Sequence, residues 1–484
     1  MELVVGVDLA TADVRVVAAA ADGRVHGQAS VPLPPPRSAR PGEVEQDAAA
    51  WWPATVAALR RLADGLGDAG ASVVAVSVCA TSGTVVAVDD RGAPVGPALT
   101  YADQRAGAEA DRAQDAGAER WGRLGLRVQP SFGLAKWGWM VRHGAVPAAA
   151  ARVAHASDVV VSGLVGGLVA TDWSSALKSG WDPLAGEWAA EALDALGVPG
   201  RLLPDVRPPG TAVGRVGAEA AGATGLPAGC EVRLGMTDAC ASQLAAGAAV
   251  PGRFVSVLGT TLVLKGVSRE LVADPGGAVY SHRHPLGWWL PGGASSTGGA
   301  ALGAGFAGRD LAALDREAAA AGPARSVAYP LVGRGERFPF VAPDAEGFVL
   351  GGDEGDAVDR YRAVLEGVAF VERLGYERLA GLGAAADGPI SASGAASASG
   401  VWNRIRATAL GVPLVAKPGA STALGACILA ASGTLHPDVA VAAEAMGAPG
   451  EEVGPVDDER EALDRSYRRF LEALGERGWL VAPG

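Results

Sequence analysis

The chain has few cysteines, few aromatic residues and a deficit of basic charge. Its four cysteines, Cys79, Cys230, Cys240 and Cys427, are scattered over 484 residues and lack the paired spacing of a zinc site or a disulfide framework. We therefore expect a reducing, cytoplasmic environment. Lys and Arg (41) are outnumbered by Asp and Glu (53), giving a formal net charge of −12, so the sequence offers no basic surface for a nucleic-acid partner.

Long apolar runs are also lacking. The longest, at 159–170, contains Ser162 and several glycines, and it falls short of the roughly 20 residues that a membrane-spanning helix needs. The first residues carry no basic segment, and Asp8 interrupts the first apolar run, so we expect no signal peptide. These absences predict a soluble protein without a membrane partner.

Two short turns resemble each other and are the most informative feature present. One lies after an apolar run at 4–7 and carries Asp8 and Thr11, and the other, at 259–261, reads Gly-Thr-Thr after an apolar run at 254–258. Such turns direct backbone N–H groups and a hydroxyl outward, which suits phosphate oxygens. Two copies about half a chain apart predict a duplicated domain with a nucleotide held between the halves.

The length favours two domains, because 484 residues exceed what one hydrophobic core usually serves. Strand-like runs alternate with helical patterns in both halves, which predicts the α/β class. We place an N-terminal domain at 1–249 and a C-terminal domain at 250–484, each a mixed β-sheet flanked by helices, with an interdomain cleft.

Hydrophobic periodicity locates the main elements. We expect helices at 48–66, 361–379, 401–410 and 423–431, and strands at 73–78, 85–88, 255–258, 262–264 and 390–395. The segment at 105–200 is expected to form helices and a few short strands inserted over the first core.

A series of motifs runs along nearly the whole chain: GVDLAT at 6–11, TSGT at 81–84, PALTYADQR at 97–105, KWGW at 136–139, GMTD at 235–238, GTT at 259–261, LEGVAF at 365–370 and SGA at 393–395. In content and order they resemble the FGGY carbohydrate kinases of the actin-like ATPase superfamily. The resemblance implies two actin-like (ribonuclease H-like) domains, ATP and Mg²⁺. TSGT at 81–84, TTLVLK at 260–265 and GGASSTGG at 292–299 look most like the D-ribulose kinase branch.

Two aspartates are the candidate chemical groups. Phosphoryl transfer to a sugar needs a carboxylate that orients the attacking hydroxyl and takes its proton. The position of Asp238 also fits helix capping, and the resemblance implies the catalytic base. Asp8 suits a Mg²⁺ held mostly through water, a role that Asp238 would share, or a hydrogen bond to a sugar hydroxyl. Asp8 could instead stabilise an Asx-type turn.

The resemblance also implies the nucleotide contacts. The glycines permit close approach of the phosphates and of a planar base to backbone. The predicted nucleotide-binding residues are Thr11, Gly259, Thr260, Thr261, Gly298, Gly299, Gly394 and Ala395. No Gly-x-x-x-x-Gly-Lys-[Ser/Thr] sequence is present, so a P-loop mechanism is not supported.

Sugar contacts are predicted on the N-terminal domain. Ser82 ends the strand at 73–78, where ligands of open α/β sheets bind, and its hydroxyl can donate and accept hydrogen bonds. Lys136 and Trp139 could cover the pocket, and Tyr101 and Asp103 are further candidates, although the tryptophan could equally belong to the core. Departures from the family pattern, such as Ala10 in place of Gly and Gly133 in place of Pro, Ser or Thr, weaken inference of the sugar.

The sequence therefore predicts an ATP-dependent kinase, monomeric or homodimeric, in which Asp238 directs a hydroxyl of a ketopentose, preferably D-ribulose, at the γ-phosphate of Mg-ATP. The first alternative is a kinase for another ketose or polyol, such as xylulose, erythritol or glycerol. The second is an actin-like ATP-binding sugar sensor without turnover, and the third is a non-enzymatic assembly protein. The presence of both Asp8 and Asp238 argues against a sensor, because a sensor needs no base.

Overall fold

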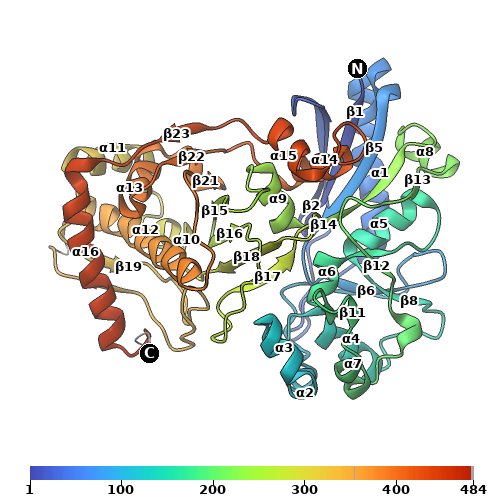
Figure 1. The fold of residues 1–484 in the computed structure, drawn as a ribbon, viewed down its shortest axis with the longest axis horizontal. Helices are drawn as coiled ribbons and strands as arrows, with labels where there is room; N and C mark the ends of the chain where they lie inside the picture. Colours follow the sequence, from blue (N-terminus) through green and yellow to red (C-terminus); the bar gives the residue numbers. More distant parts are fainter. Residues whose placement is uncertain (354, 481–484) are drawn as a thin grey trace. The chain divides into compact units, whose positions relative to one another are not determined.

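A computed structural model describes residues 1–353 and 355–480 (Figure 1). The chain divides into two compact units. The first comprises Met1–Ala249, His282–Gly287 and Ser421–Gly447, and the second comprises Val250–Ser281, Trp288–Ala420 and Ala448–Gly484. The first change of unit follows residue 249, and the segments 282–287 and 421–447 belong to the first unit.

The first unit is built on a six-stranded sheet in the order β13-β14-β5-β1-β2-β3. Its central strands β1 and β5 are rich in Val and almost wholly buried, as expected of strands covered on both faces. The strands are β1 (Leu3–Leu9), β2 (Asp13–Ala20), β3 (Val25–Pro32), β5 (Val73–Ala80), β13 (Ala212–Arg215) and β14 (Glu231–Thr237).

Shorter strands accompany that sheet in the first unit. A four-stranded sheet has the order β4-β7-β6-β8, and two further pairs are β9 with β12 and β10 with β11. Their bounds are β4 (Glu45–Gln46), β6 (Val85–Val88), β7 (Ala98–Leu99), β8 (Arg152–His155), β9 (Thr171–Asp172), β10 (Trp181–Asp182), β11 (Glu187–Trp188) and β12 (Val206–Arg207).

The helices of the first unit come from both ends of the chain. They are α1 (Trp51–Leu66), α2 (Gly107–Ala116), α3 (Ala118–Leu124), α4 (Gly133–Arg142), α5 (Ala156–Val165), α6 (Trp173–Leu177), α7 (Ala190–Leu196), α8 (Ala218–Thr224), α9 (Asp238–Ala245), α14 (Thr422–Ala431) and α15 (Val439–Met446). Within the segment 105–200, which was expected to lie over the first core, α5 contributes Val159, Val160 and Leu164 to that core.

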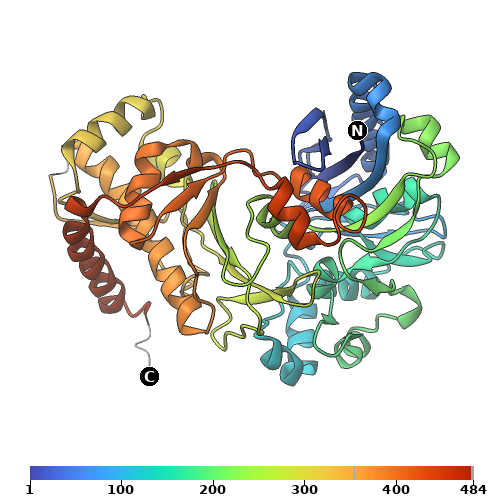
Figure 2. The same cartoon turned by 45° about the horizontal axis from the view of Figure 1, so that its top comes forward.

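Helix α14 packs against β1, β5 and β14, although some 400 residues of sequence separate it from β1 (Figure 2). The close approach depends on small residues. A Cβ atom added at Gly6 would lie 2.0 Å from the backbone oxygen of Ala423. Because real Cβ atoms do not approach backbone oxygen this closely, only glycine permits this packing.

The second unit repeats the pairing of the first. Its sheet has the order β17-β18-β16-β15-β21-β22-β23. The antiparallel hairpin β15–β16 corresponds to β1–β2, and the parallel neighbours β21 and β22 correspond to β5 and β14. The strands of this sheet are β15 (Phe254–Leu258), β16 (Leu262–Gly266), β17 (Tyr280–Arg283), β18 (Trp289–Ala294), β21 (Ile390–Ser393), β22 (Leu414–Ala416) and β23 (Glu451–Val453). The last two residues of β17 are counted in the first unit. The duplication predicted from the two turns is confirmed at the level of strand pairing.

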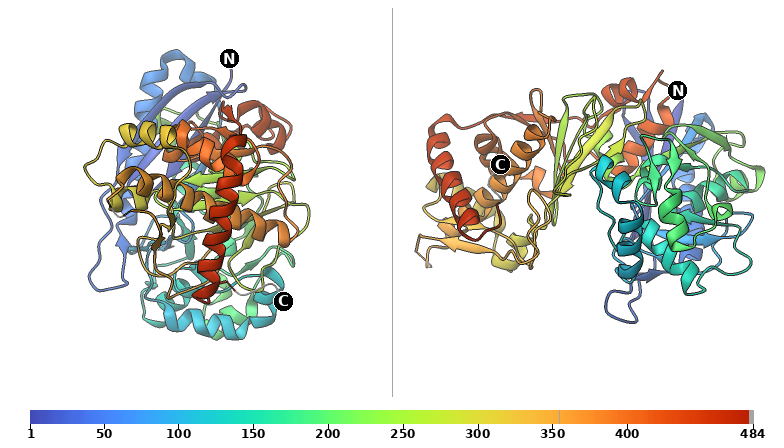
Figure 3. Two further views of the ribbon diagram at one scale, coloured as in Figure 1. Left: turned by 90° about the vertical axis from the view of Figure 1, so that its left-hand side faces the viewer. Right: turned by 60° about the horizontal axis from the view of Figure 1, so that its bottom comes forward.

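Helices and a small hairpin complete the second unit. The helices are α10 (Ala300–Gly305), α11 (Leu311–Ala321), α12 (Ala357–Gly381), α13 (Gly400–Leu410) and α16 (Asp457–Glu476), and the hairpin joins β19 (Val327–Tyr329) to β20 (Phe348–Leu350). Helix α16 packs against α12 and α13 (Figure 3), and its Leu463, Tyr467 and Phe470 enter the second core. Among the described residues, no helix combines the length and apolar character needed to cross a membrane.

Candidate active site

Three predicted site residues lie at one edge of the first unit's sheet. Strands β1, β5 and β14 are parallel neighbours. Asp8 lies one residue before the end of β1, Ser82 lies two residues beyond the end of β5, and Asp238 directly follows β14. Because the carboxyl ends of parallel neighbours meet at one edge, the fold brings these three polar residues together where ligands of open α/β sheets bind.

Asp8 is almost completely buried, with 3% of its surface exposed. Burial raises the pKa of its carboxyl to about 7, against the attraction of Arg15 and with a further contribution from the nearby charge of Asp238. The Arg15 guanidinium lies 3.3 Å from Asp8 Oδ2. A buried carboxyl with a second acidic group nearby is a feature of sites that bind cations or move protons.

Asp238 is the first residue of α9, and the end of β14 is anchored just before it. The Ala239 N–H donates to Asp238 Oδ1 at 2.8 Å. The Thr237 N–H donates to Ser174 Oγ at 2.9 Å, and Ser174 in turn donates to the buried carboxyl of Asp172. This chain of hydrogen bonds fixes the backbone on which Asp238 stands.

The Ser82 hydroxyl is buried at the end of β5, in the turn that follows the strand. Among the described residues it has no hydrogen-bond partner. A buried hydroxyl without a partner costs free energy, so its retention is expected where a ligand supplies the missing hydrogen bond. The role of Ser82 as a sugar contact stays a prediction.

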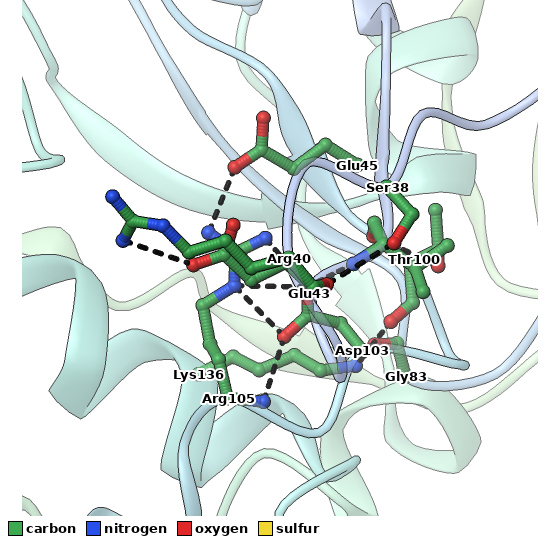
Figure 4. Close-up of polar contacts among 10 residues, drawn as sticks. Ser38, Arg40, Glu43, Glu45, Gly83, Thr100, Asp103, Arg105 and Lys136 are labelled. Atoms are coloured by element: carbon green, nitrogen blue, oxygen red, sulfur yellow. Dashed lines mark hydrogen bonds and ion pairs between the residues drawn. The ribbon is translucent and has the colours of Figure 1, made fainter.

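Lys136 is placed differently from the expectation that it covers the sugar pocket. Its side chain is fully buried, and Nζ donates to the backbone oxygens of Gly83 at 2.9 Å and Thr100 at 2.5 Å (Figure 4). Burial lowers the pKa of this amine to about 7, against the attraction of Asp103. Lys136 therefore ties the turn that contains Ser82 to the segment after β7, which is a positioning role.

Asp103 is fully buried and belongs to the same network (Figure 4). Its Oδ2 accepts the Val44 N–H at 2.7 Å and lies 2.7 Å from the Arg105 guanidinium, which also contacts Glu45 at 2.8 Å. Arg105 stacks over the ring of Trp139, 4.8 Å from its centroid. These side chains join the 37–45 loop to α4, and the contacts that occupy Asp103 and Trp139 are structural.

The second unit contains a cavity of about 570 Å³ beside the Gly-Thr-Thr turn. This volume falls in the range of small-molecule sites. The cavity is lined by Gly259, Thr260, Gly299, Ala300, Leu302, Gly303, Leu311, Ala312, Asp315, Tyr361, Ala395, Ala396, Ala398, Ser399 and Trp402. Four predicted nucleotide-binding residues, Gly259, Thr260, Gly299 and Ala395, are among them.

Three other predicted nucleotide-binding residues, Thr261, Gly298 and Gly394, are next in sequence to residues that line this cavity. A Cβ atom at Gly298 would lie 2.5 Å from Thr261 Cα, and one at Gly394, where φ is +84°, would lie 2.6 Å from the Leu258 oxygen. Neither position has room for a side chain. Thr11 belongs to the first unit, where its backbone oxygen accepts a hydrogen bond from Gln46 at 2.8 Å.

The sequence did not indicate a polar group that also lines the cavity, Asp315 with Tyr361 and Ser399. Asp315 accepts hydrogen bonds from the Tyr361 hydroxyl at 2.7 Å and from Ser399 Oγ at 2.8 Å. The three residues come from α11, α12 and the residue before α13. Of the three, only Ser399 leaves a local signal in the sequence, because serine is favoured as a helix N-cap. Its Oγ accepts the Trp402 N–H at 3.1 Å.

The acidic groups fit a Mg²⁺ ion that arrives with a nucleotide. Over residues 1–353 and 355–480, no cluster of three or more His, Cys, Asp or Glu could hold a metal ion by itself. Mg²⁺ keeps several waters and is usually held by one or two carboxylates together with substrate phosphates. Asp8 and Asp238 supply such a pair, and a divalent cation would offset their mutual repulsion.

Comparison with known proteins agrees with these features. The N-terminal domain of the FGGY family of carbohydrate kinases matches residues 3–245, and the C-terminal domain of the same family matches residues 254–434. The chain therefore belongs to the FGGY family of carbohydrate kinases.

Individual relatives are named as kinases of several polyhydroxy compounds. The xylulose kinase of Streptomyces coelicolor is 34% identical over 60% of this chain and 59% of its own length. The glycerol kinase of Thermus brockianus is 28% identical over 91% of this chain and 92% of its own. The crystal structure of xylulose kinase from Rhodospirillum rubrum superimposes with a TM-score of 0.87 at 30% identity, over 98% of this chain and 99% of the other.

Proposed function

We propose that this protein is an ATP-dependent kinase that phosphorylates a ketopentose. The observation that carries the proposal is the division of polar groups between the two units. Asp8, Ser82 and Asp238 meet at the strand ends of the first unit, and a cavity of nucleotide size adjoins the Gly-Thr-Thr turn of the second. Membership of the FGGY family supports the same chemistry.

Asp238 is proposed as the general base. Its carboxylate accepts the proton of the attacking sugar hydroxyl as that oxygen bonds to the γ-phosphorus, and the bond from this phosphorus to the bridging oxygen breaks, so ADP leaves with the electron pair. Asp8, with Asp238, is proposed to hold Mg²⁺, which when bound neutralises charge on the phosphates. Ser82 is proposed to hold the sugar through its otherwise unpartnered hydroxyl.

The nucleotide is proposed to lie in the cavity of the second unit with its phosphates at Gly259 and Thr260. Backbone N–H groups in a tight turn attract phosphate oxygens. The carboxylate of Asp315 would repel phosphate, so the nucleoside is assigned to the part of the lining that contains Asp315, Tyr361 and Ser399. Because the sugar and the nucleotide contact different units, turnover requires both substrates to be bound together.

Two ketopentoses are candidates for the acceptor. The segment at 81–84 and the motifs at 260–265 and 292–299 favour D-ribulose, whereas the relatives named xylulose kinases favour D-xylulose. The two sugars differ only in the configuration of one carbon, so a site that hydrogen-bonds that hydroxyl distinguishes them. Glycerol and gluconate, named for other relatives, form the wider panel.

The test is ATP consumption against D-ribulose, D-xylulose, other ketoses, glycerol and gluconate, compared by kcat/KM, with the phosphorylated product identified by mass spectrometry. We expect a ketopentose to give the highest kcat/KM. Turnover on glycerol or gluconate with none on either ketopentose would replace the proposed substrate class. ATP binding without turnover on any of these compounds would favour a sensor over a kinase.

A further inference from the structure

A single buried carboxylate outside the cavity organises the segment that supports the Gly-Thr-Thr turn. Glu336 is 3% exposed and accepts five hydrogen bonds. Its Oε2 receives the hydroxyls of Ser295 at 2.8 Å, Thr297 at 3.1 Å and Tyr329 at 3.0 Å. Its Oε1 receives the backbone N–H groups of Ser296 at 2.6 Å and of the next residue in the chain at 2.9 Å. Three of the five donors belong to consecutive residues of one segment, 295–297.

That segment is bonded to the strand that leaves the turn. The Ser295 N–H donates to the Leu262 oxygen, and the Leu262 N–H donates to the Thr297 oxygen, both at 2.8 Å. Leu262 is the first residue of β16 and directly follows the turn. Glu336 therefore fixes the segment, and the segment fixes the end of the turn.

The residues that follow the segment bond to the turn itself. The Gly299 N–H donates to the Gly259 oxygen at 2.9 Å, and the Ala300 N–H donates to the Thr260 oxygen at 3.0 Å. A trans peptide unit points its oxygen and its N–H in opposite directions. With the Gly259 and Thr260 oxygens fixed, the N–H groups of Thr260 and Thr261 must point away from residues 299 and 300.

We propose that Glu336 is a positioning residue for the nucleotide phosphates, acting through residues 295–297 on the direction of the Thr260 and Thr261 N–H groups. The proposal rests on the assignment of the cavity to ATP. Glu336 suits this role because a carboxylate offers two acceptor oxygens, and five donors converge on them here, three on Oε2 and two on Oε1. It does not line the cavity, so its effect on ATP is indirect.

The test is Glu336→Gln, with KM for ATP and for the sugar measured separately. The amide nitrogen of Gln is a donor and would face N–H or O–H donors. The hydrogen bonds that this atom position accepts from the 295–297 segment are therefore lost. We expect KM for ATP to rise about tenfold or more, as for loss of buried hydrogen bonds, and KM for the sugar to stay within about twofold. Thr297→Val removes one hydroxyl donor at nearly constant shape and should raise KM for ATP by a smaller factor.

Glu366→Gln is the matched control. Glu366 is also a buried carboxylate of the second unit, but it is bonded to the Ala324 N–H at 3.0 Å and to Arg362 at 2.7 Å rather than to the 295–297 segment. This variant tests general loss of stability and should retain the wild-type KM for ATP. Thermal unfolding of all variants shows which are folded. If Glu336→Gln does not fold, the KM for ATP of Thr297→Val is used to test the proposal instead.

Calorimetry with a non-hydrolysable ATP analogue measures nucleotide binding without turnover. It therefore tests the positioning role of Glu336 separately from the proposed kinase activity. If the wild type binds the analogue but phosphorylates no sugar, the proposed activity fails, and weaker binding by Glu336→Gln still supports the positioning role. The role is overturned if folded Glu336→Gln keeps the wild-type affinity, if both KM values rise equally, or if Glu366→Gln weakens ATP binding as much. It is also overturned if the wild type binds no nucleotide.

Discussion

At the scale of single residues, the Ser82 hydroxyl gives the most direct test of the sugar site, because it is buried and has no partner among the described residues. Ser82→Ala should weaken sugar binding by about 1–3 kcal/mol, the cost of leaving a sugar hydroxyl unpaired in the complex. Affinity for ATP should not change. Calorimetry with each ligand measures both effects.

Ser77→Ala is the control for that experiment. Ser77 lies within β5, three residues before its end, and its buried hydroxyl also lacks a partner over the described part of the chain. Removing it should leave sugar affinity unchanged. Equal losses for the two variants would indicate a general effect on β5, and no loss for Ser82→Ala would remove Ser82 from the site.

Asp238 carries the proposed proton transfer. Asp238→Asn keeps the size of the side chain but cannot accept the proton, so kcat should fall by about 10²–10⁴-fold, with nucleotide binding retained. Asp438→Asn makes the same change at the start of α15, where the side chain caps the helix, and should have little effect on kcat. Near-full turnover by Asp238→Asn at saturating sugar would refute the assignment of the base.

Sequence could indicate Asp8, Ser82 and Asp238 because each follows or ends a strand-like run, a local pattern. It could not indicate the partners of buried groups. Glu336 and Ser295 lie 41 positions apart, and their pairing depends on how distant segments fold together. Lys136 is a second example. Its motif was recognisable in the sequence, but its buried contacts with two backbone oxygens were not.

At the scale of elements, α4 is anchored by an amine whose pKa burial lowers to about 7. Between this value and the pKa of lysine in the unfolded chain, the unfolded state binds more protons, so the contribution of Lys136 to stability increases as pH rises. Compared with Lys136→Met, the wild type should gain about 2 kcal/mol of unfolding free energy between pH 7 and pH 9. Urea unfolding at both pH values measures the difference.

Arg142→Met, on the same helix, is the control for this pH dependence. Arg142 is partly exposed, and arginine side chains in general do not lose a proton in proteins. Its removal should therefore change stability equally at pH 7 and pH 9. A difference between wild type and Lys136→Met that does not vary with pH would show that the folded protein holds Lys136 charged throughout.

The principal elements were predictable because their periodicity is local. The strand expected at 73–78 is β5 (Val73–Ala80), and the helix expected at 361–379 is α12 (Ala357–Gly381). The location of α14 was not predictable. Its sequence is apolar all round, which indicates burial but not the sheet against which it packs. Only tertiary contacts place it on β1 of the first unit.

At the scale of the whole molecule, the two proposed binding regions belong to different units, which has a consequence for catalysis. If water reached the γ-phosphate whenever ATP was bound, ATP would be hydrolysed without forming a sugar phosphate. Efficient kinases therefore become catalytically competent only when the sugar is bound. We expect little ATP hydrolysis without sugar and strong stimulation by the true ketopentose. Phosphate release measured with and without each sugar tests this, and a strong sugar-independent rate would favour the sensor alternative.

The packing of α14 on β1 also bears on how the protein is made. During synthesis, residues 1–249, which contain β1 and the rest of its sheet, leave the ribosome first. The helix that covers β1 follows only after the roughly 170 further residues of Val250–Ser281, His282–Gly287 and Trp288–Ala420. At about 5–20 residues per second this delay is on the order of 10–35 s. Throughout that time one face of the N-terminal sheet remains uncovered, so the nascent chain should depend on chaperones, and chains released before residue 421 should aggregate.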